Sequence, residues 1–156
     1  DYYETETDNY KKGKVTYPFR DLAPGLHTIL FKAWDVYNNL ITAEIQFIVI
    51  GDGDLELEHV LNYPNPFVNY TEFWFNHNRP FEPLEVQVQI LTITGKLVKT
   101  INQTIVNEGF NSRDVKWDGK DDFGDRIGKG VYVYRLIVKS SVTGKKTEKI
   151  EKLVIK

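Results

Sequence analysis

The chain has 156 residues, of which 41% are hydrophobic and 13% aromatic, and this composition fits one large globular domain or two small ones. The formal net charge of −2 provides no field that would gather nucleic acid, so no nucleic-acid partner is expected. The absence of cysteine excludes disulfides, thiolate metal sites and a thiol nucleophile within this chain.

Residues 1–50 are predicted to form three strands. Alternating Val15, Tyr17 and Phe19 indicate the first strand, and residues 26–35 and 41–49 indicate a hairpin that turns at Asn38-Asn39. Three strands leave apolar surface uncovered, so we expect the C-terminal strands of a truncated immunoglobulin-like domain. We further expect this part to pack on the second domain or to pair with another molecule, for example by strand swapping.

Residues 51–56 are predicted to be a linker, because they begin with alternating glycine and aspartate. A sharp corner follows at the motif Tyr63, Pro64, Asn65, Pro66 and Phe67, where two prolines remove two backbone donors. The aromatic Tyr63 makes a cis bond before Pro64 more frequent than elsewhere, but we expect this bond to be trans. We also expect the corner to carry the chain from one sheet to another.

Residues 57–156 show the spacing of an all-β domain. Strands are predicted around 60, at 71–77, 84–90, 97–106, near 115–117, at 131–140 and from Lys145 to Lys156. These seven strands, with no helical periodicity, predict an immunoglobulin-like antiparallel β-sandwich with Trp117 and Tyr134 in its core. No apolar run approaches the roughly 20 residues that span a bilayer, so direct membrane insertion is not expected. The chain begins with Asp1 rather than Met, so we expect a fragment of a longer protein.

The candidate chemical sites are weak. Asp118, Asp121, Asp122 and Asp125 could bind Ca²⁺, but their spacing differs from that of an EF-hand, and a hydrogen-bonded loop is favoured. The three histidines lie on different predicted strands without a triad-like arrangement. We therefore expect no catalytic set, no metal and no cofactor. Tyr70 and Trp74 could form a sugar-stacking platform, although a core role is favoured.

The last strand carries the clearest candidate interaction surface. Residues 139–156 contain six lysines and two glutamates. Lysines on a final strand reduce edge-to-edge aggregation, and they could also steer a partner that adds to the strand. The candidate partner-binding residues are Lys145, Lys146, Lys149, Ile150, Lys152, Leu153, Ile155 and Lys156.

Four stretches resemble the C-terminal sorting domains of the Bacteroidetes type IX secretion system. They are residues 61–67 (LNYPNPF), 88–97 (VQILTITGKL), 115–121 (VKWDGKD) with Gly124 following, and 130–136 (GVYVYRL). The immunoglobulin-like domain of the flagellar hook-capping protein is similar in the same motifs. Residues 32–35 (KAWD) with Asn38-Asn39, and residues 71–78 (TEFWFNHN), are more narrowly similar to the C-terminal part of PorU-type sortases of the gingipain family.

This resemblance implies a parent protein with a cysteine peptidase-like domain that removes sorting domains from secreted cargo and attaches the product to surface lipopolysaccharide. It also implies a PorV-like outer-membrane barrel protein as partner and a location at the cell surface. The catalytic cysteine and histidine would lie outside this chain, so the chain itself is expected to be a non-catalytic docking region. The alternatives are the sorting domain of an ordinary secreted cargo enzyme and a carbohydrate-binding module.

Overall fold

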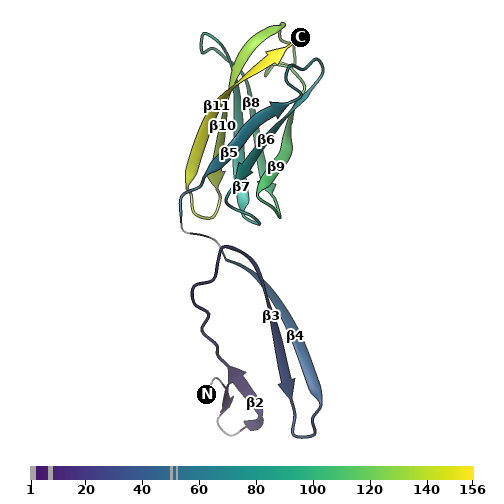
Figure 1. Cartoon of the computed structure of the whole chain (residues 1–156), viewed down its shortest axis with the longest axis vertical. Helices are drawn as coiled ribbons and strands as arrows, with labels where there is room; N and C mark the ends of the chain where they lie inside the picture. The colour runs from purple at the N-terminus through teal and green to yellow at the C-terminus, as the bar shows by residue number, and fades with distance from the viewer. Residues whose placement is uncertain (1–2, 7–8, 50, 52) are drawn as a thin grey trace.

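The computed structural model describes residues 3–6, 9–49, 51 and 53–156, which form strands and connecting loops (Figure 1). Among these residues there is no helix, and hence none long and apolar enough to cross a membrane. Residues 50 and 52, at the predicted boundary between the first strands and the linker, lie outside the described residues. The strands are β1 (Tyr3–Glu6), β2 (Asn9–Val15), β3 (Gly25–Trp34), β4 (Leu40–Val49), β5 (Leu57–Tyr63), β6 (Thr71–His77), β7 (Pro83–Thr92), β8 (Leu97–Val106), β9 (Asn111–Trp117), β10 (Gly130–Ser140) and β11 (Lys146–Ile155).

The N-terminal part consists of two separate two-stranded sheets, β1 with β2 and β3 with β4. The strand predicted from Val15 to Phe19 is wrong, because β2 ends at Val15 and residues 16–20 form no strand. Pro18 lies in this segment and lacks the backbone N–H that a ladder needs. The hairpin prediction is confirmed: Asn38 has a φ of 65°, and the Asp35 carboxylate accepts hydrogen bonds from the N–H groups of Tyr37 and Asn39.

The β3–β4 hairpin has an uncovered apolar face. Register places Ile29 opposite Ile45 and Phe31 opposite Ala43 on this face. Near the base of the hairpin, Phe19 packs on Phe47 at 6.1 Å between ring centroids, whereas Phe31 and Ile45 remain exposed. No strand of β1–β4 contacts a strand of β5–β11 among the described residues, and Figure 1 shows the hairpin extending away from the sandwich. The predicted packing of the hairpin on the second domain is therefore absent here.

Strands β5–β11 form the predicted seven-stranded antiparallel sandwich. One sheet has the order β11-β10-β7-β8 and the other the order β5-β6-β9. The alternating burial of β6 and β7 follows the period-two pattern of their sequences, because only one face of each strand points between the sheets. The two sheets meet through aromatic contacts, including Phe73 with Tyr134 at 4.8 Å between ring centroids.

The two motif aromatics, Trp117 and Tyr134, are buried. The Trp117 indole N–H donates to the Lys120 carbonyl oxygen at 2.8 Å, and its ring packs against Phe67 at 5.6 Å between centroids. Burial raises the pKa of the Tyr134 hydroxyl, so this group stays neutral at physiological pH.

The proline corner joins β5 to β6. Both the Tyr63-Pro64 and Asn65-Pro66 peptide bonds are cis, so the trans expectation for Tyr63-Pro64 was wrong. Two buried polar side chains hold the corner: the Asn62 amide donates to the Thr71 hydroxyl at 3.0 Å, and this hydroxyl donates to the Pro64 carbonyl oxygen at 2.9 Å. β5 and β6 are adjacent strands of one sheet, so the corner does not carry the chain between the two sheets.

Replacing Trp117 by Ala should lower the free energy of unfolding of the sandwich by about 3 kcal/mol or more, because a large buried side chain is lost and a cavity remains. Denaturant unfolding with a core fluorescence or circular dichroism signal measures this change. Val142→Ala, at an exposed position, is the matched control and should have little effect. A Trp117→Ala variant that unfolds at the parent's midpoint would contradict the assigned core.

The exposed hairpin face should drive self-association of the isolated chain, because apolar area on one sheet face has no cover within the described residues. We expect sedimentation velocity to show concentration-dependent association. Phe31→Asp with Ile45→Asp should weaken it, whereas Val142→Asp, at an exposed apolar position of the sandwich, should not. A parent chain that stays monomeric, with residues 1–50 disordered by NMR, would show this expectation to be wrong.

Candidate functional site

The predicted docking strand β11 forms one edge of the four-stranded sheet and pairs along its whole length with β10. Because side chains alternate between the two faces of a strand, the candidate residues cannot share one surface. Leu153 and Ile155 are buried in the core, whereas Ile150 is exposed. Lys146, Ile150 and Lys152 share the outer face. These three residues are the part of the predicted set that a partner can reach together.

The remaining three lysines have other surroundings. Lys149 lies on the same side of β11 as the core residues and lines a shallow hollow with Leu57 and Glu58 of β5. Lys156 ends the chain, and its backbone N–H donates to the Phe67 carbonyl oxygen at 2.9 Å. The Lys145 ammonium group binds the linker, donating to the Gly53 carbonyl oxygen at 2.9 Å.

The proline corner occupies half of the outer edge of β11. The Asn65 amide donates to the Lys152 carbonyl oxygen at 3.1 Å, and its side-chain oxygen accepts the Val154 N–H at 3.0 Å. Phe67 continues this pairing, because its N–H donates to the Val154 carbonyl oxygen at 3.0 Å. An added strand could therefore pair only with the first half of β11, before Lys152.

The outer face next to β11 is basic. Arg135 and Lys139 of β10 lie beside β11, and Lys139 pairs with Glu85 of β7 at 3.1 Å. Arg135 has no acidic partner among the described residues. A groove of about 400 Å³ runs along this face, and its lining includes Glu85, Gln87, Asn102, Thr104, Lys139 and Lys146. Basic and amide side chains in this arrangement suit an acidic or polar extended segment.

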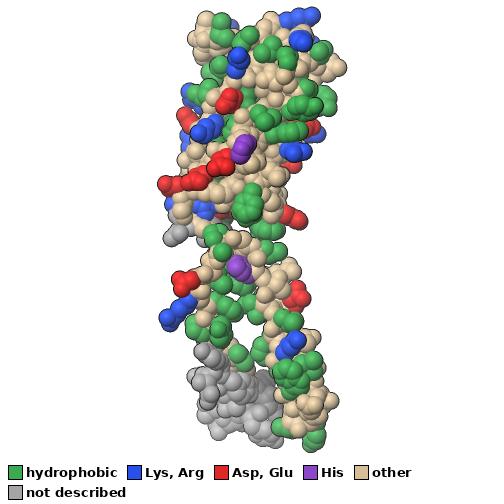
Figure 2. All heavy atoms as spheres, viewed as in Figure 1, with side chains coloured by type: hydrophobic (Ala, Val, Ile, Leu, Met, Phe, Trp, Pro, Cys, Tyr) green, Lys and Arg blue, Asp and Glu red, His purple; other side chains and the backbone are tan. Residues whose placement is uncertain are grey.

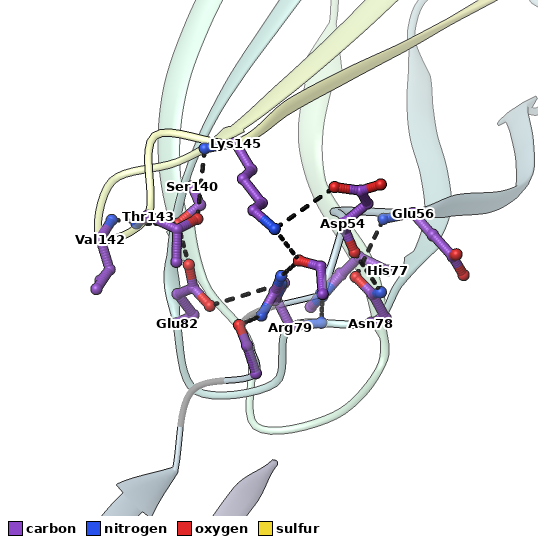
Figure 3. Close-up of polar contacts among 12 residues, drawn as sticks. Asp54, Glu56, His77, Asn78, Arg79, Glu82, Ser140, Val142, Thr143 and Lys145 are labelled. Carbon is purple, nitrogen blue, oxygen red and sulfur yellow. Dashed lines mark hydrogen bonds and ion pairs between the residues drawn. The ribbon is translucent and has the colours of Figure 1, made fainter.

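A second cluster, which we call the linker clamp, consists of Asn78, Arg79 and Lys145 (Figure 3). The buried Arg79 guanidinium donates to the carbonyl oxygens of Gly51 and Gly53. Asn78 donates to the Asp54 carbonyl oxygen at 2.8 Å and accepts the Glu56 N–H at 3.1 Å. Three side chains of the sandwich thus hold the linker through its backbone.

The clamp has a buried ionic support. Arg79 faces Glu82 at 3.9 Å from Nε to Oε2, and both side chains are almost fully buried. Glu82 also accepts a hydrogen bond from the Ser140 hydroxyl. The His77 ring accepts the Arg79 backbone N–H at 3.2 Å, and burial lowers the pKa of this histidine. Removing either charge would leave the other one buried without its partner, which is costly.

The sequence predicts a turn at residues 78–83 but not the clamp. Its local signal is only a pair of opposite charges, Arg79 and Glu82, in a proline-containing turn. The partners that give this pair a role, Gly51, Gly53 and Ser140, are distant in sequence. Asn62 and Thr71 were missed for the same reason, because their role depends on the folded corner.

The aspartate-rich loop is held by hydrogen bonds. Asp121 Oδ1 accepts the N–H groups of Phe123 and Asp125, both at 2.9 Å. Asp118 pairs with Lys120 at 3.4 Å, and Asp122 pairs with Lys99 at 3.3 Å. No group of three carboxylate or histidine side chains converges on one point within the described residues. The carboxylates serve the loop conformation that the sequence favours.

Trp74 lies on the outer face of the three-stranded sheet, so the expected core role is wrong for this residue. The Arg113 guanidinium covers its ring at 4.0 Å from the centroid, and Tyr63 packs against it at 5.1 Å between centroids. A sugar-stacking platform needs an open aromatic face, and Arg113 occupies the face of Trp74.

These features define an immunoglobulin-like sandwich with a proline corner bonded to its last strand. No family model matches the chain, and no curated protein matches it. Among solved structures, the chain is similar to dimeric latent PorU from Porphyromonas gingivalis, with 29% sequence identity, a TM-score of 0.56, and coverage of 99% of this chain and 14% of that chain. This similarity confirms the predicted resemblance to a PorU-type C-terminal region. PorZ, described as an essential bacterial surface component of the type IX secretion system of P. gingivalis, matches with 20% identity and a TM-score of 0.34, over 63% of this chain and 11% of its own.

The linker clamp should fix the hairpin relative to the sandwich. In an Arg79→Met, Glu82→Gln variant, which removes both buried charges, we expect the sandwich to stay folded while the hairpin tumbles independently in ¹⁵N relaxation measurements. Arg79→Met alone should destabilise the sandwich more than the double variant, because Glu82 stays charged. Glu85→Gln, at an exposed ion pair, is the control. Unchanged common tumbling of hairpin and sandwich in the double variant would contradict this role.

Proposed function

We propose that this chain is the non-catalytic C-terminal docking region of a type IX secretion protein. The observation that carries the proposal is the similarity to PorU over 99% of the chain. The chain spans only 14% of that PorU chain, and it contains no cysteine. A thiol nucleophile would therefore belong to another part of the parent protein, which we propose to be a gingipain-family, cysteine peptidase-like sortase.

The proposed partner is a PorV-like outer-membrane barrel protein, which would hold the parent protein at the cell surface. The outer face of β11 is our candidate for the docking surface, because Lys146, Ile150 and Lys152 lie there together. The unoccupied first half of the β11 edge offers backbone groups for strand addition, and the lysines would steer an acidic partner segment.

Charge reversal tests this docking surface. Lys146→Glu with Lys152→Glu should slow association with a purified PorV-like barrel protein in detergent by about tenfold at low salt, and the salt dependence should weaken. The melting temperature should be almost unchanged, because both side chains are exposed. Biolayer interferometry at two salt concentrations and thermal unfolding measure these effects.

The matched control is Lys14→Glu with Lys32→Glu, which makes the same change in net charge on the N-terminal strands. Deleting residues 150–156 is unsuitable as a test, because it would also remove the buried Leu153 and Ile155. Equal association rates for the β11 variant and the parent would show that the docking surface lies elsewhere and that these lysines only keep an edge strand soluble.

A further inference from the structure

The end of the sandwich farthest from the linker carries three loops with protruding apolar side chains. These loops are residues 64–70 between β5 and β6, residues 93–96 between β7 and β8, and residues 118–129 between β9 and β10 (Figure 1). Phe123 is 92% exposed, Ile93 is 74% exposed and Tyr70 is 54% exposed. We call these three residues the apical tips. Each loop contributes one tip.

The longest loop is bonded to the loop of Tyr70 and to β8, the strand that follows the loop of Ile93. Arg126 of the longest loop donates to the Val68 carbonyl oxygen at 2.8 Å, which ties it to the loop of Tyr70. On the other side, Asp122 accepts the Thr100 N–H at 3.3 Å and pairs with Lys99, which ties the loop to the start of β8. Two of the three loops are therefore joined directly, and the longest loop is also fixed to the strand that follows Ile93.

The longest loop is built to expose its aromatic residue. The Asp121 carboxylate accepts hydrogen bonds from the N–H groups of Phe123 and Asp125, which fixes a tight turn. Gly124 in this turn has a φ of 92°, a backbone conformation that favours glycine. This turn would form equally well with a polar residue at position 123, so its geometry gives no reason for a phenylalanine. An exposed aromatic side chain on a fixed turn is a feature of interaction surfaces.

The charges around the tips favour an anionic surface. Asp118 and Asp122 are paired with Lys120 and Lys99, and the Asp121 carboxylate accepts hydrogen bonds from backbone N–H groups. The Asp125 carboxylate has no basic partner among the described residues, but Lys96, Arg126 and Lys129 around the tips outnumber it. Lys96 and Lys129, in the loops of Ile93 and Phe123, are exposed and have no acidic partner among the described residues. Figure 2 shows Lys and Arg side chains beside hydrophobic ones at this end.

We propose that the apical tips insert into the headgroup region of an anionic lipid bilayer, with Lys96 and Lys129 contacting lipid phosphates. Separate apolar residues on three protruding loops suit a lipid interface, because lipids adapt around each side chain without the shape complementarity that a protein pocket requires. Lysines near the tips add attraction to anionic headgroups. This contact would be peripheral, and it would act in addition to docking through a barrel protein.

Site-specific fluorescence tests the proposal cleanly, because the chain has no cysteine. The probe is a polarity-sensitive NBD fluorophore on a single introduced cysteine, Phe123→Cys, mixed with vesicles of equal parts phosphatidylglycerol and phosphatidylcholine. We expect a blue shift and protection from aqueous iodide at this position. Val142→Cys, at the linker end of the sandwich, is the labelling control and should stay accessible to iodide even if the apolar hairpin face binds lipid.

Vesicle flotation supplies the second measurement. Ile93→Ser with Phe123→Ser should lower the vesicle partition coefficient of the sandwich by on the order of tenfold. Higher salt should lower this partition coefficient further. Phe110→Ser with Val142→Ser, at similarly exposed positions of the other end, should leave it unchanged. The proposal is overturned if the label at position 123 stays in an aqueous environment, or if the Ile93 and Phe123 variant binds vesicles like the parent. It is equally overturned if the tips are protected only by the barrel protein or by a second copy of the chain.

Discussion

The sandwich depends on the bonded contact between its proline corner and its last strand. Phe67 donates to the Val154 carbonyl oxygen and accepts the Lys156 N–H, while its ring is buried against Trp117. This contact joins the corner between β5 and β6 to β11. Its Asn65 to Lys152 hydrogen bond links residues that are 87 positions apart in the sequence. It brings the two sheets together at one edge, so the corner motif and the final strand form one structural unit.

The same contact limits where the sheet can recruit another strand. The corner occupies the second half of the β11 edge, and at the other edge of that sheet the aspartate-rich loop bonds to β8 through the Val98 carbonyl oxygen and the Thr100 N–H. Covered edges protect a β-protein against unspecific pairing. Among the described residues the first half of the β11 edge remains open, and it carries the exposed Lys146 and Lys149. Specific docking and resistance to aggregation can therefore coexist on one strand.

The sequence was sufficient for the strands whose side chains alternate strictly. β6 has the predicted bounds, because one of its faces is buried and period two is then obligatory. β8 also has the predicted bounds, although its burial does not alternate. The pattern at Val15 to Phe19 failed because no partner strand covers it. The docking residues were predicted as one group, but β11 divides them between core and surface, since Leu153 and Ile155 point inward. The linker clamp could not be predicted, because Arg79 acquires its role only from carbonyl groups distant in sequence.

The linker clamp has a consequence for how this region can change during evolution. Arg79, Asn78 and Lys145 bind carbonyl oxygens of the linker, and every amino acid supplies such an oxygen. Most linker positions can therefore change in sequence without loss of the contacts between the linker and the sandwich. A Cβ at Gly53, for example, would meet no atom within 4 Å. Gly51 and Leu55 are the exceptions, because a Cβ at Gly51 would lie 3.0 Å from the Arg79 guanidinium and the Leu55 side chain is buried in the core of the sandwich. Among related chains, selection should act on Gly51, on Leu55 and on the residues that bind the linker, while the other linker side chains vary.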